Sequence, residues 1–502
     1  MPTKTLVRRD GSRTIDELLL DHGTHLPRRE VVPPPPPEVP LFPKVIPANG
    51  RRAPGHGWAP TRPNLAGYEM TSEQTPVMWP LIAGDGLPPW GAEMGYNVLS
   101  GGKFYFDPLG WVNDDSIPVT NTNVFQYGMP GYGKSSIVKI AILRLIPFGY
   151  RGLILGDVSN EYEALCEALD CPPHKIGPGL AGRLNPLDPG PLGDGWDRLP
   201  PAEQRRRVGV IFSRWLMLMR GLVTSQGVDY TPTEDQVLTR ILEDLAGVGG
   251  DGCRYLRPVV VPQVWQVLRD PSEKLVEDCR YASRQDFWEQ TRGLRDALGS
   301  LCTGALRGMF DAESTIHPDW QAPIQSLSLK ALYDTKNDAA TGIALMCLSS
   351  WGRGMRELAP AGDHVLSVRD ETWFQTRLGL GAVANLDADL RTSRKDGDLQ
   401  WVVFHKPSDP LSAGDVGSQA YNIAKDMANL ASTRILMAQD EEVGEELGSM
   451  FGLSEMQQQV VTRWSKQAKG RGLWLVGDRK YKVQTYLTPV EKVLTYTNKA
   501  IA

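Results

Sequence analysis

The sequence lacks the features that mark several common classes of protein. No apolar run approaches the length that spans a bilayer, and the N-terminal MPTKTLVRRDGSRT has no apolar core of the kind found in signal peptides. Its six cysteines form no C-x-x-C pair and its seven histidines show no ligand spacing. We therefore expect reduced thiols and no zinc site. Together these absences predict a cytoplasmic protein without a transmembrane segment.

An excess of positive charge is also missing. The chain has 54 lysines and arginines against 59 aspartates and glutamates, a formal net charge of −5. This balance argues against DNA binding through a generally basic surface, although it leaves room for local contacts with DNA. The length and overall composition are ordinary. A chain of 502 residues with 41% apolar and 23% charged content is typical of a soluble globular protein of two or three domains.

The first 65 residues differ in composition from the rest. They hold 13 of the 39 prolines, including the run from Pro33 to Pro37, and few large apolar side chains. Such a segment cannot bury enough surface to offset its ordering entropy, so residues 1–65 are predicted to be a disordered proline-rich tail. The amphipathic piece from Thr14 to Leu20 fits either a partner-binding segment or part of a plain spacer.

A glycine-rich loop at 128–136, GMPGYGKSS, predicts a nucleotide site. It follows the strand-like run 123–127 and precedes a helix-like run at 137–143. The spacing G-x-x-x-x-G-K-S lets backbone N–H groups curl around a triphosphate, while Lys134 supplies a positive charge and Ser135 a hydroxyl for Mg²⁺. The candidate nucleotide-binding residues are Gly128, Pro130, Gly131, Tyr132, Gly133, Lys134, Ser135 and Ser136.

A second acidic motif supplies what hydrolysis needs beyond binding. The strand-like run HVLSVRDE at 364–371 ends in Asp370 and Glu371, and the carboxyl ends of strands are where ligands lie in open α/β sheets. We expect Asp370 to hold Mg²⁺ through water and Glu371 to polarise the attacking water. The alternative is an acid pair that simply ends a strand.

The remaining pattern predicts an α/β fold interrupted by helices. Further strands are expected at 151–157, 399–405 and 433–439, a helix at 160–169, and a closing hairpin at 472–487. Periodic apolar positions predict a helical insertion at 197–312. The predicted core therefore has two parts, 66–196 and 313–502.

Five motifs in order resemble the TraC-like ATPases of conjugation and type IV secretion systems, within the FtsK/HerA group of ring-forming motors. The motifs are GMPGYGKSS, GDVSNEYEALCEALD, RLNPLDPG, RDETW and SRKDGDLQWVVFHKPSD. The family's D-x-x-x-E-Y, N-P-L-D and D-E-x-W patterns match Asp157, Glu161 and Tyr162, then Asn185 to Asp188, then Asp370, Glu371 and Trp373. The likeness runs from about residue 85 to about residue 495.

The resemblance implies a RecA-like core that binds ATP and Mg²⁺. It further implies a homo-hexamer, peripheral to the inner face of the cell membrane, that contacts other channel components. The family's arginine that acts on the neighbouring subunit matches Arg394, with Arg391 in reserve; the alternative for both is a solvated charge run.

Two residues depart from the family pattern. The family's sensor glutamine after the fourth strand is replaced by His405, which can also donate a hydrogen bond to a phosphate. Position 369, usually aliphatic, is Arg369.

The leading hypothesis is a Mg-dependent ATPase motor that powers assembly of, or substrate transfer through, a conjugation-type secretion channel. One alternative is a DNA-translocating motor of the coupling-protein or FtsK type. The other is a nucleotide-binding scaffold that turns over little ATP, which Arg369 and His405 make conceivable.

Overall fold

The structure, a computed structural model, describes residues 86–496 with short gaps. The gaps are 225, 250–252, 254, 305, 317, 318, 320, 321, 357–363, 371, 378, 379, 394–396 and 416. The predicted proline-rich tail lies outside the described residues, as do Glu371 and Arg394.

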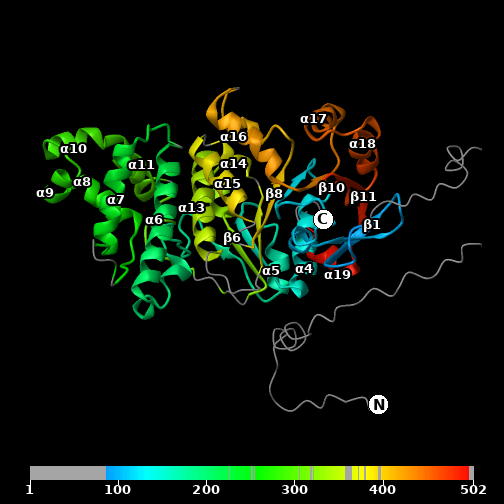
Figure 1. Cartoon of the computed structure of the whole chain (residues 1–502), viewed down its shortest axis with the longest axis horizontal. Coiled ribbons are helices and arrows are strands. Elements are labelled where there is room, and N and C mark those ends of the chain that lie inside the picture. Colours follow the sequence, from blue (N-terminus) through cyan, green and yellow to red (C-terminus); the bar gives the residue numbers. More distant parts are fainter. Residues whose placement is uncertain are drawn as a thin grey trace, which may run out of the picture. The chain divides into compact units, whose positions relative to one another are not determined.

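One sheet of 11 strands organises the described residues (Figure 1). Its order is β2-β1-β11-β10-β9-β3-β8-β7-β4-β6-β5. The strands are β1 (Ala92–Asn97), β2 (Lys103–Phe106), β3 (Val124–Tyr127), β4 (Tyr150–Asp157), β5 (His174–Lys175), β6 (Ile324–Ser328), β7 (His364–Arg369), β8 (Leu399–Phe404), β9 (Thr433–Leu436), β10 (Arg471–Val476) and β11 (Arg479–Thr485).

The centre of the sheet is parallel and its β10 side is antiparallel. Strand β3 pairs in parallel with β8 and β9, and β7 pairs in parallel with β8 and β4. Every residue of β3 and β8 is buried, as expected for central parallel strands covered on both faces. Tyr127 lies opposite both Phe404 and Leu436, so the three strands end at one level and bring their following loops to one edge.

Helices cover both faces of the sheet and make a three-layer α/β/α core. The helices of this core are α3 (Pro108–Val112), α4 (Lys134–Leu145), α5 (Glu163–Ala168), α12 (Lys330–Tyr333), α13 (Asp338–Arg356), α14 (Trp373–Thr376), α15 (Leu380–Thr392), α16 (Gln419–Met427), α17 (Glu441–Phe451), α18 (Glu455–Gln459) and α19 (Pro489–Leu494). Helices α4 and α5 share one apolar core with a face of the sheet. Helices α13, α15, α16 and α17 pack on the opposite face.

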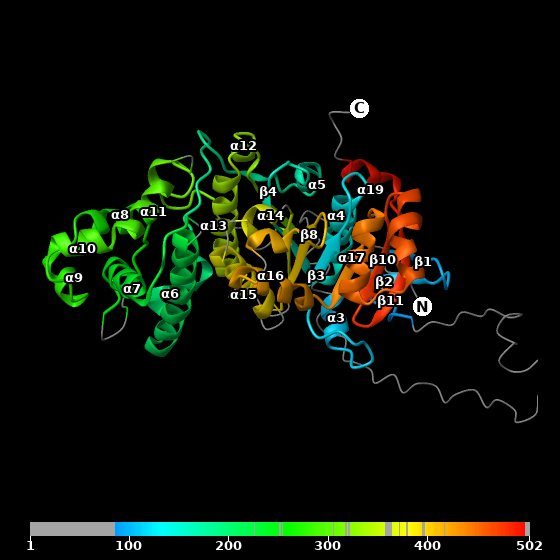
Figure 2. The ribbon, with the colours of Figure 1, turned by 90° about the horizontal axis from the view of Figure 1, so that it is seen from above.

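A group of helices separates β5 from β6 along the chain. They are α6 (Pro201–Thr224), α7 (Pro232–Ala246), α8 (Val261–Arg269), α9 (Glu273–Asp278), α10 (Arg284–Gln290) and α11 (Arg292–Thr303). Figures 1 and 2 show this group beyond α13, away from the sheet, and α6 packs on α13 and α15. Trp215 and Met219 are buried in its core, as the periodicity predicts. The exact limits 197–312 stay a prediction.

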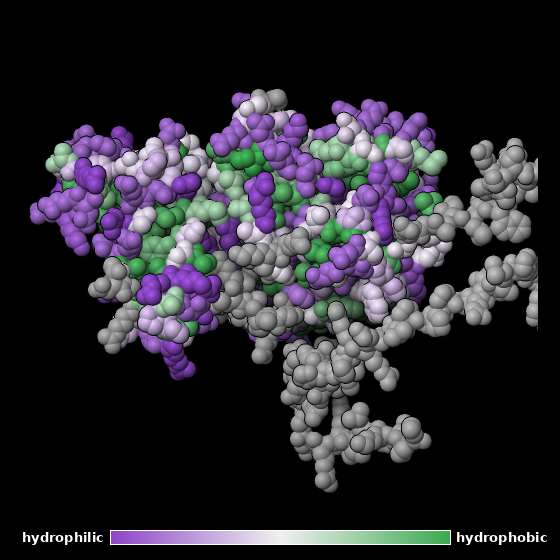
Figure 3. All heavy atoms as spheres, viewed as in Figure 1, coloured by the Kyte–Doolittle hydropathy of each residue, from purple (hydrophilic) through white to green (hydrophobic). Residues whose placement is uncertain are grey.

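The outside of this helical group is polar on one visible face. In Figure 3 the outer helices α9 and α10 are largely hydrophilic.

Among the described residues, no helix combines the length and apolarity needed to cross a bilayer. All six cysteines are free thiols.

The predicted α/β, RecA-like fold class is confirmed, with one shorter helix than expected. The helix predicted from 160 begins at Glu163. Asn160 has a positive φ of 54°, and the Asp157 carboxylate accepts backbone N–H groups of Ser159, Glu161 and Tyr162. These hydrogen bonds stabilise a turn in place of the first helical turn.

Candidate nucleotide site

The glycine loop connects β3 to α4 in a conformation that requires glycine. Gly131 and Gly133 have φ values of 85° and 94°, in the left-handed region that side chains disfavour. Gly128 is needed for a different reason, because a Cβ there would lie 2.8 Å from Met437 Cβ in the segment after β9. Helix α4 begins at Lys134, so its first N–H groups face the loop and can bind phosphate.

The exposure of the loop residues suits a ligand from outside. Pro130 and Gly131 are exposed, whereas Tyr132, Ser135 and Ser136 are partly buried. A Cβ built on Gly131 would meet nothing within 4 Å, so the loop opens to free space at that point. The residues that the sequence predicts to bind phosphate therefore lie on an open loop whose glycines have positive φ values.

Lys134 and His405 lie together at this edge of the sheet. Lys134 is buried, at 8% exposure, and its Nζ donates to the Gly128 carbonyl at 2.8 Å. The same Nζ lies 3.2 Å from Nδ1 of His405. An ammonium group can only donate, so Nδ1 accepts in this contact and the ring hydrogen is on Nε2. This tautomer leaves His405 with an N–H that can serve an anion.

Two neighbours fix His405 after the end of β8. Its backbone N–H donates to the Asp409 carboxylate at 2.8 Å, and its carbonyl accepts from Nε2 of Gln439 at 2.6 Å. Gln439 belongs to the segment after β9. The histidine is thus held by the loop after β8 and the segment after β9, the two strands that flank β3, a position that suits a sensor of bound phosphate.

Gln126 is a site residue that the sequence did not reveal. This buried side chain of β3 donates to the Lys134 carbonyl at 3.2 Å and accepts from Trp401 Nε1 at 2.9 Å. It therefore connects β8 to the first turn of α4. Within an apolar strand run, a single glutamine gives no signal of such a role.

The acidic motif lies at the same edge. Asp370 follows directly after β7, and it is partly buried. Leu366 and Val368, which alternate with it along the strand, pack in the core shared with α4, so Asp370 is on the same face of the sheet as that helix. The Ser135 hydroxyl and the Asp370 carboxylate are hard oxygen donors, which fit Mg²⁺.

Metal ligands of another kind are missing from this part of the chain. Among the described residues, no cluster of histidine, cysteine, aspartate or glutamate has the arrangement of a protein-only metal site. Mg²⁺ bound together with a nucleotide usually takes only one or two protein ligands. The residues present therefore fit a metal that arrives with the nucleotide.

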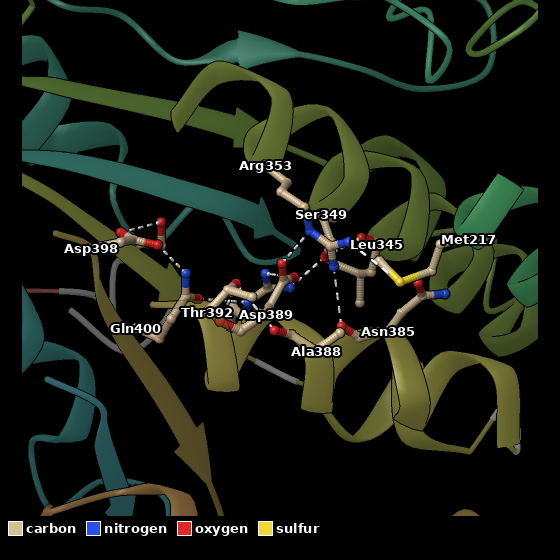
Figure 4. A network of polar contacts seen from close by, with 12 residues as sticks. Met217, Leu345, Ser349, Arg353, Asn385, Ala388, Asp389, Thr392, Asp398 and Gln400 are labelled. Carbon is tan, nitrogen blue, oxygen red and sulfur yellow. Dashed lines mark hydrogen bonds and ion pairs between the residues drawn. The ribbon is translucent and has the colours of Figure 1, made fainter. Parts of the chain in front are cut away.

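Arg369 points away from this site and is fully compensated. It is buried at 3% exposure and its guanidinium lies 2.5 Å from the Asp389 carboxylate, which Arg353 also contacts at 2.6 Å (Figure 4). Arg369 also donates to Gln400 Oε1 at 3.1 Å and to the Ser349 hydroxyl. The departure from an aliphatic residue thus builds a polar link among β7, β8, α13 and α15.

Arg394 itself is outside the described residues, but the residues that flank it are not near the glycine loop of the same chain. Ser393 donates to Asn123 Oδ1 at 2.7 Å, and Thr122 donates to the Asp398 carbonyl. Residues 122 and 123 precede β3, whereas the glycine loop follows it, so the segment flanking Arg394 is at the opposite edge of the sheet. Arg391, in the last turn of α15, is exposed and pairs with Asp387 at 2.7 Å.

The N-P-L-D pattern braces a turn and does not reach the glycine loop. Asn185 donates to the Val259 carbonyl at 2.7 Å and accepts from the Leu187 N–H. Asp188 accepts from the Gly190 N–H and from the Ser314 hydroxyl. These residues join the sheet region to the helical group.

Comparisons with known proteins agree with this geometry. No protein-family model matches the chain, and no curated protein sequence matches it. The solved structure of VirB4 of Thermoanaerobacter pseudethanolicus superposes with a TM-score of 0.62 at 19% identity, covering 81% of this chain and 100% of that one. The bacterial conjugative coupling protein TrwB, in an unbound form, gives a TM-score of 0.47 at 12% identity over 73% of this chain and 85% of that one. The likeness to VirB4 shows that this chain shares its RecA-like fold.

Proposed function

We propose that this protein is a Mg-dependent ATPase motor that powers assembly of, or substrate transfer through, a conjugation-type (type IV) secretion channel. The observation that carries the proposal is the contact between Lys134 and His405, 3.2 Å apart, on the sheet edge that also holds Asp370. A glycine loop, a sensor-like group and an acid are the parts that phosphoryl transfer requires. The shared fold with VirB4 and the five ordered motifs support the secretion role.

Each residue has a separate task in this mechanism. The backbone N–H groups of 128–136 and the Lys134 ammonium bind the phosphates of ATP, and Ser135 and Asp370 hold the metal. Mg²⁺ would neutralise charge that develops on the phosphate oxygens. Glu371 polarises the attacking water, and the Nε2–H of His405 is the donor toward the outer phosphate.

The proposed assembly is a homo-hexamer at the cytoplasmic face of the membrane, with Arg394 acting on the neighbour's ATP. The opposite-edge position of the flanking residues Ser393 and Asp398 favours this arrangement. Strand β3 has four residues, so the two edges are about 13 Å apart at ~3.3 Å per residue. This position of the flanking residues favours a role for Arg394 across a subunit boundary over a role on the nucleotide of its own chain.

The test is ATP turnover by the full chain, with and without DNA, beside Lys134→Ala. We expect turnover that DNA does not change. The alanine variant should bind ATP about 30-fold more weakly, since losing a charged hydrogen-bonding group is worth about 2 kcal/mol. Lys492→Ala, an exposed lysine of α19, is the matched control and should match the parent.

Two outcomes would contradict the proposal. Strong stimulation by DNA would favour a DNA-translocating motor. Tight ATP binding with almost no turnover would favour a nucleotide-binding scaffold.

A further inference from the structure

A second group of polar side chains lies close to the nucleotide site, on the β4 side. Lys139 is in α4, five residues after Lys134. Glu161 and Tyr162 follow β4 in the turn that the Asp157 carboxylate stabilises. The Lys139 ammonium lies 5.5 Å from the centre of the Tyr162 ring, so the helix and the turn meet at this point.

Three buried atoms of this group have no hydrogen-bond partner. They are Lys139 Nζ, Glu161 Oε2 and Tyr162 Oη. Lys139 and Tyr162 are both 0% exposed. Buried polar groups are nearly always paired, and a buried ammonium is among the most expensive to leave unpaired. Three such atoms in one place indicate a site that the described residues do not complete by themselves.

The pKa shifts of Lys139 and Tyr162 identify the acidic side chains whose charges act on this group. Burial lowers the pKa of Lys139, while Glu161, Asp157 and Asp370 oppose that effect. Burial raises the pKa of Tyr162, and Asp370, Glu161 and Asp157 raise it further. Two different side chains are thus influenced by the same three acids. Asp157 already accepts three backbone N–H groups, whereas Oε2 of Glu161 has no hydrogen-bond partner among the described residues.

We propose that Lys139 is a positioning residue of the ATPase site, whose ammonium orients the Glu161 and Asp370 carboxylates so that both bind the hydrated Mg²⁺ of Mg-ATP. This inference rests on the proposed function and extends it in two ways. It assigns Glu161 to the metal, and it assigns a task to a lysine that lies outside the glycine loop. Tyr162 Oη, at the same place, is available to hydrogen-bond water of the metal's hydration shell.

The purely structural alternative predicts a different result. If Lys139 served only packing, its replacement by methionine would remove an unpaired buried charge, which is often neutral or stabilising. A positioning role predicts the same stability but a changed requirement for Mg²⁺. Partners of this kind typically alter metal affinity by about 10- to 100-fold when they are removed.

The experiment measures binding of a fluorescent, non-hydrolysable ATP analogue to the full chain across a Mg²⁺ titration and in EDTA. We expect Lys139→Met to require about 10- to 100-fold more Mg²⁺ for half-maximal tight binding. Its affinity in EDTA and its melting temperature should not fall. Lys139→Arg, which keeps the charge, should lie nearer the parent. Ile140→Met, on the next position of α4, is the control for repacking and should leave the Mg²⁺ requirement unchanged.

Glu161→Gln tests the same group of side chains through a different member. It should also raise the Mg²⁺ requirement, and the double variant with Lys139→Met should be no worse than the poorer single one, because the two residues act together. An unchanged requirement in either single variant overturns the inference, and if Lys139→Met does not fold, Glu161→Gln decides alone. Mg-dependent binding and turnover by the parent, lost in Lys134→Ala, would keep the proposed function intact in that event.

Discussion

At the scale of single residues, His405 is the most informative departure from the family pattern. Its Nδ1 accepts from Lys134 and its ring hydrogen is on Nε2. A glutamine side chain has the same two functions, with a carbonyl that can accept from the lysine and an amide that can donate. A histidine can therefore replace a sensor glutamine without changing the pattern of hydrogen bonds.

This equivalence leads to a prediction for two substitutions at 405. His405→Gln should keep most of the ATP turnover, whereas His405→Ala should bind ATP but lose about 10²-fold in kcat, as when one preorganised donor is removed. Single-turnover rates and nucleotide affinity, measured separately, check this. The neighbouring exposed Lys406→Ala is the control. Parent-like turnover in His405→Ala would remove the sensor role.

The buried ion group at Arg369 gives a prediction about stability. Asp389 is 1% exposed and compensates both Arg369 and Arg353. Asp389→Asn removes the carboxylate that pairs with the buried Arg369 and the partly buried Arg353, so the free energy of unfolding should fall by about 3–5 kcal/mol. Asp387→Asn, in the same helix, loses only the pair with the exposed Arg391. It should change the free energy of unfolding by less than about 1 kcal/mol. Urea unfolding of both variants makes the comparison. Equal losses would show that the buried group does not act as a unit.

At the scale of elements, Arg144 joins the helix of the nucleotide site to the C-terminal helix. From the last turn of α4 it donates to Glu491 of α19 at 2.7 and 2.6 Å, and also to the carbonyls of Glu93 and Tyr486. Burial alone would raise the pKa of Glu491, but hydrogen bonds from Arg144 and Thr488 outweigh it, and the pKa is lowered. Folding therefore favours the ionised form of Glu491, and its pair with Arg144 stabilises the folded state at neutral pH.

Glu491→Gln should lower the free energy of unfolding by about 1.5–3 kcal/mol at pH 7, the usual value of hydrogen bonds to charged groups. A carboxylate whose pKa is lowered by folding stabilises above its unfolded pKa, and loses that contribution as the pH falls through the folded pKa. The gap between parent and variant should therefore narrow below about pH 4. Urea unfolding of the parent and the variant between neutral and acid pH measures this difference in the free energy of unfolding. A gap that does not change with pH would mean that the charge of Glu491 is not involved.

Central elements could be predicted from the sequence, and contacts between elements could not. β3, β4, β7 and β8 were predictable because strands buried on both faces form apolar runs bounded by glycine or acid. The β1–β2 hairpin was not placed, since its strands are short and half-exposed. The glycine loop was predictable because its backbone requires positive φ values, and these need glycines at fixed spacings that the sequence shows. Gln126 and Lys139 were not, because their roles depend on which strand lies beside them.

At the scale of the whole molecule, the position of the residues that flank Arg394 makes the oligomer testable. The residues flanking Arg394 bond to the segment before β3, at the edge opposite to Lys134 and His405. A ring places such an edge against the neighbour's nucleotide, as the hexamer proposed above requires. A monomer would leave these arginines without a catalytic task.

Mixing two inactive variants should therefore restore activity. Arg394→Ala loses the group that acts on the neighbour, whereas Glu371→Gln binds ATP but cannot polarise water. An interface with an intact Glu371 on one side and an intact Arg394 on the other forms only in mixed rings. An arginine acting in trans is worth about 10³-fold or more in rate, so even a minority of repaired interfaces should give turnover well above either variant alone.

The measurement is ATP turnover against mixing ratio, with subunit exchange followed by a fluorescent label. Arg391→Ala mixed in the same way is the control, because its pairing with Asp387 on its own helix predicts a smaller loss. Exchange without any recovery would exclude a trans role for Arg394.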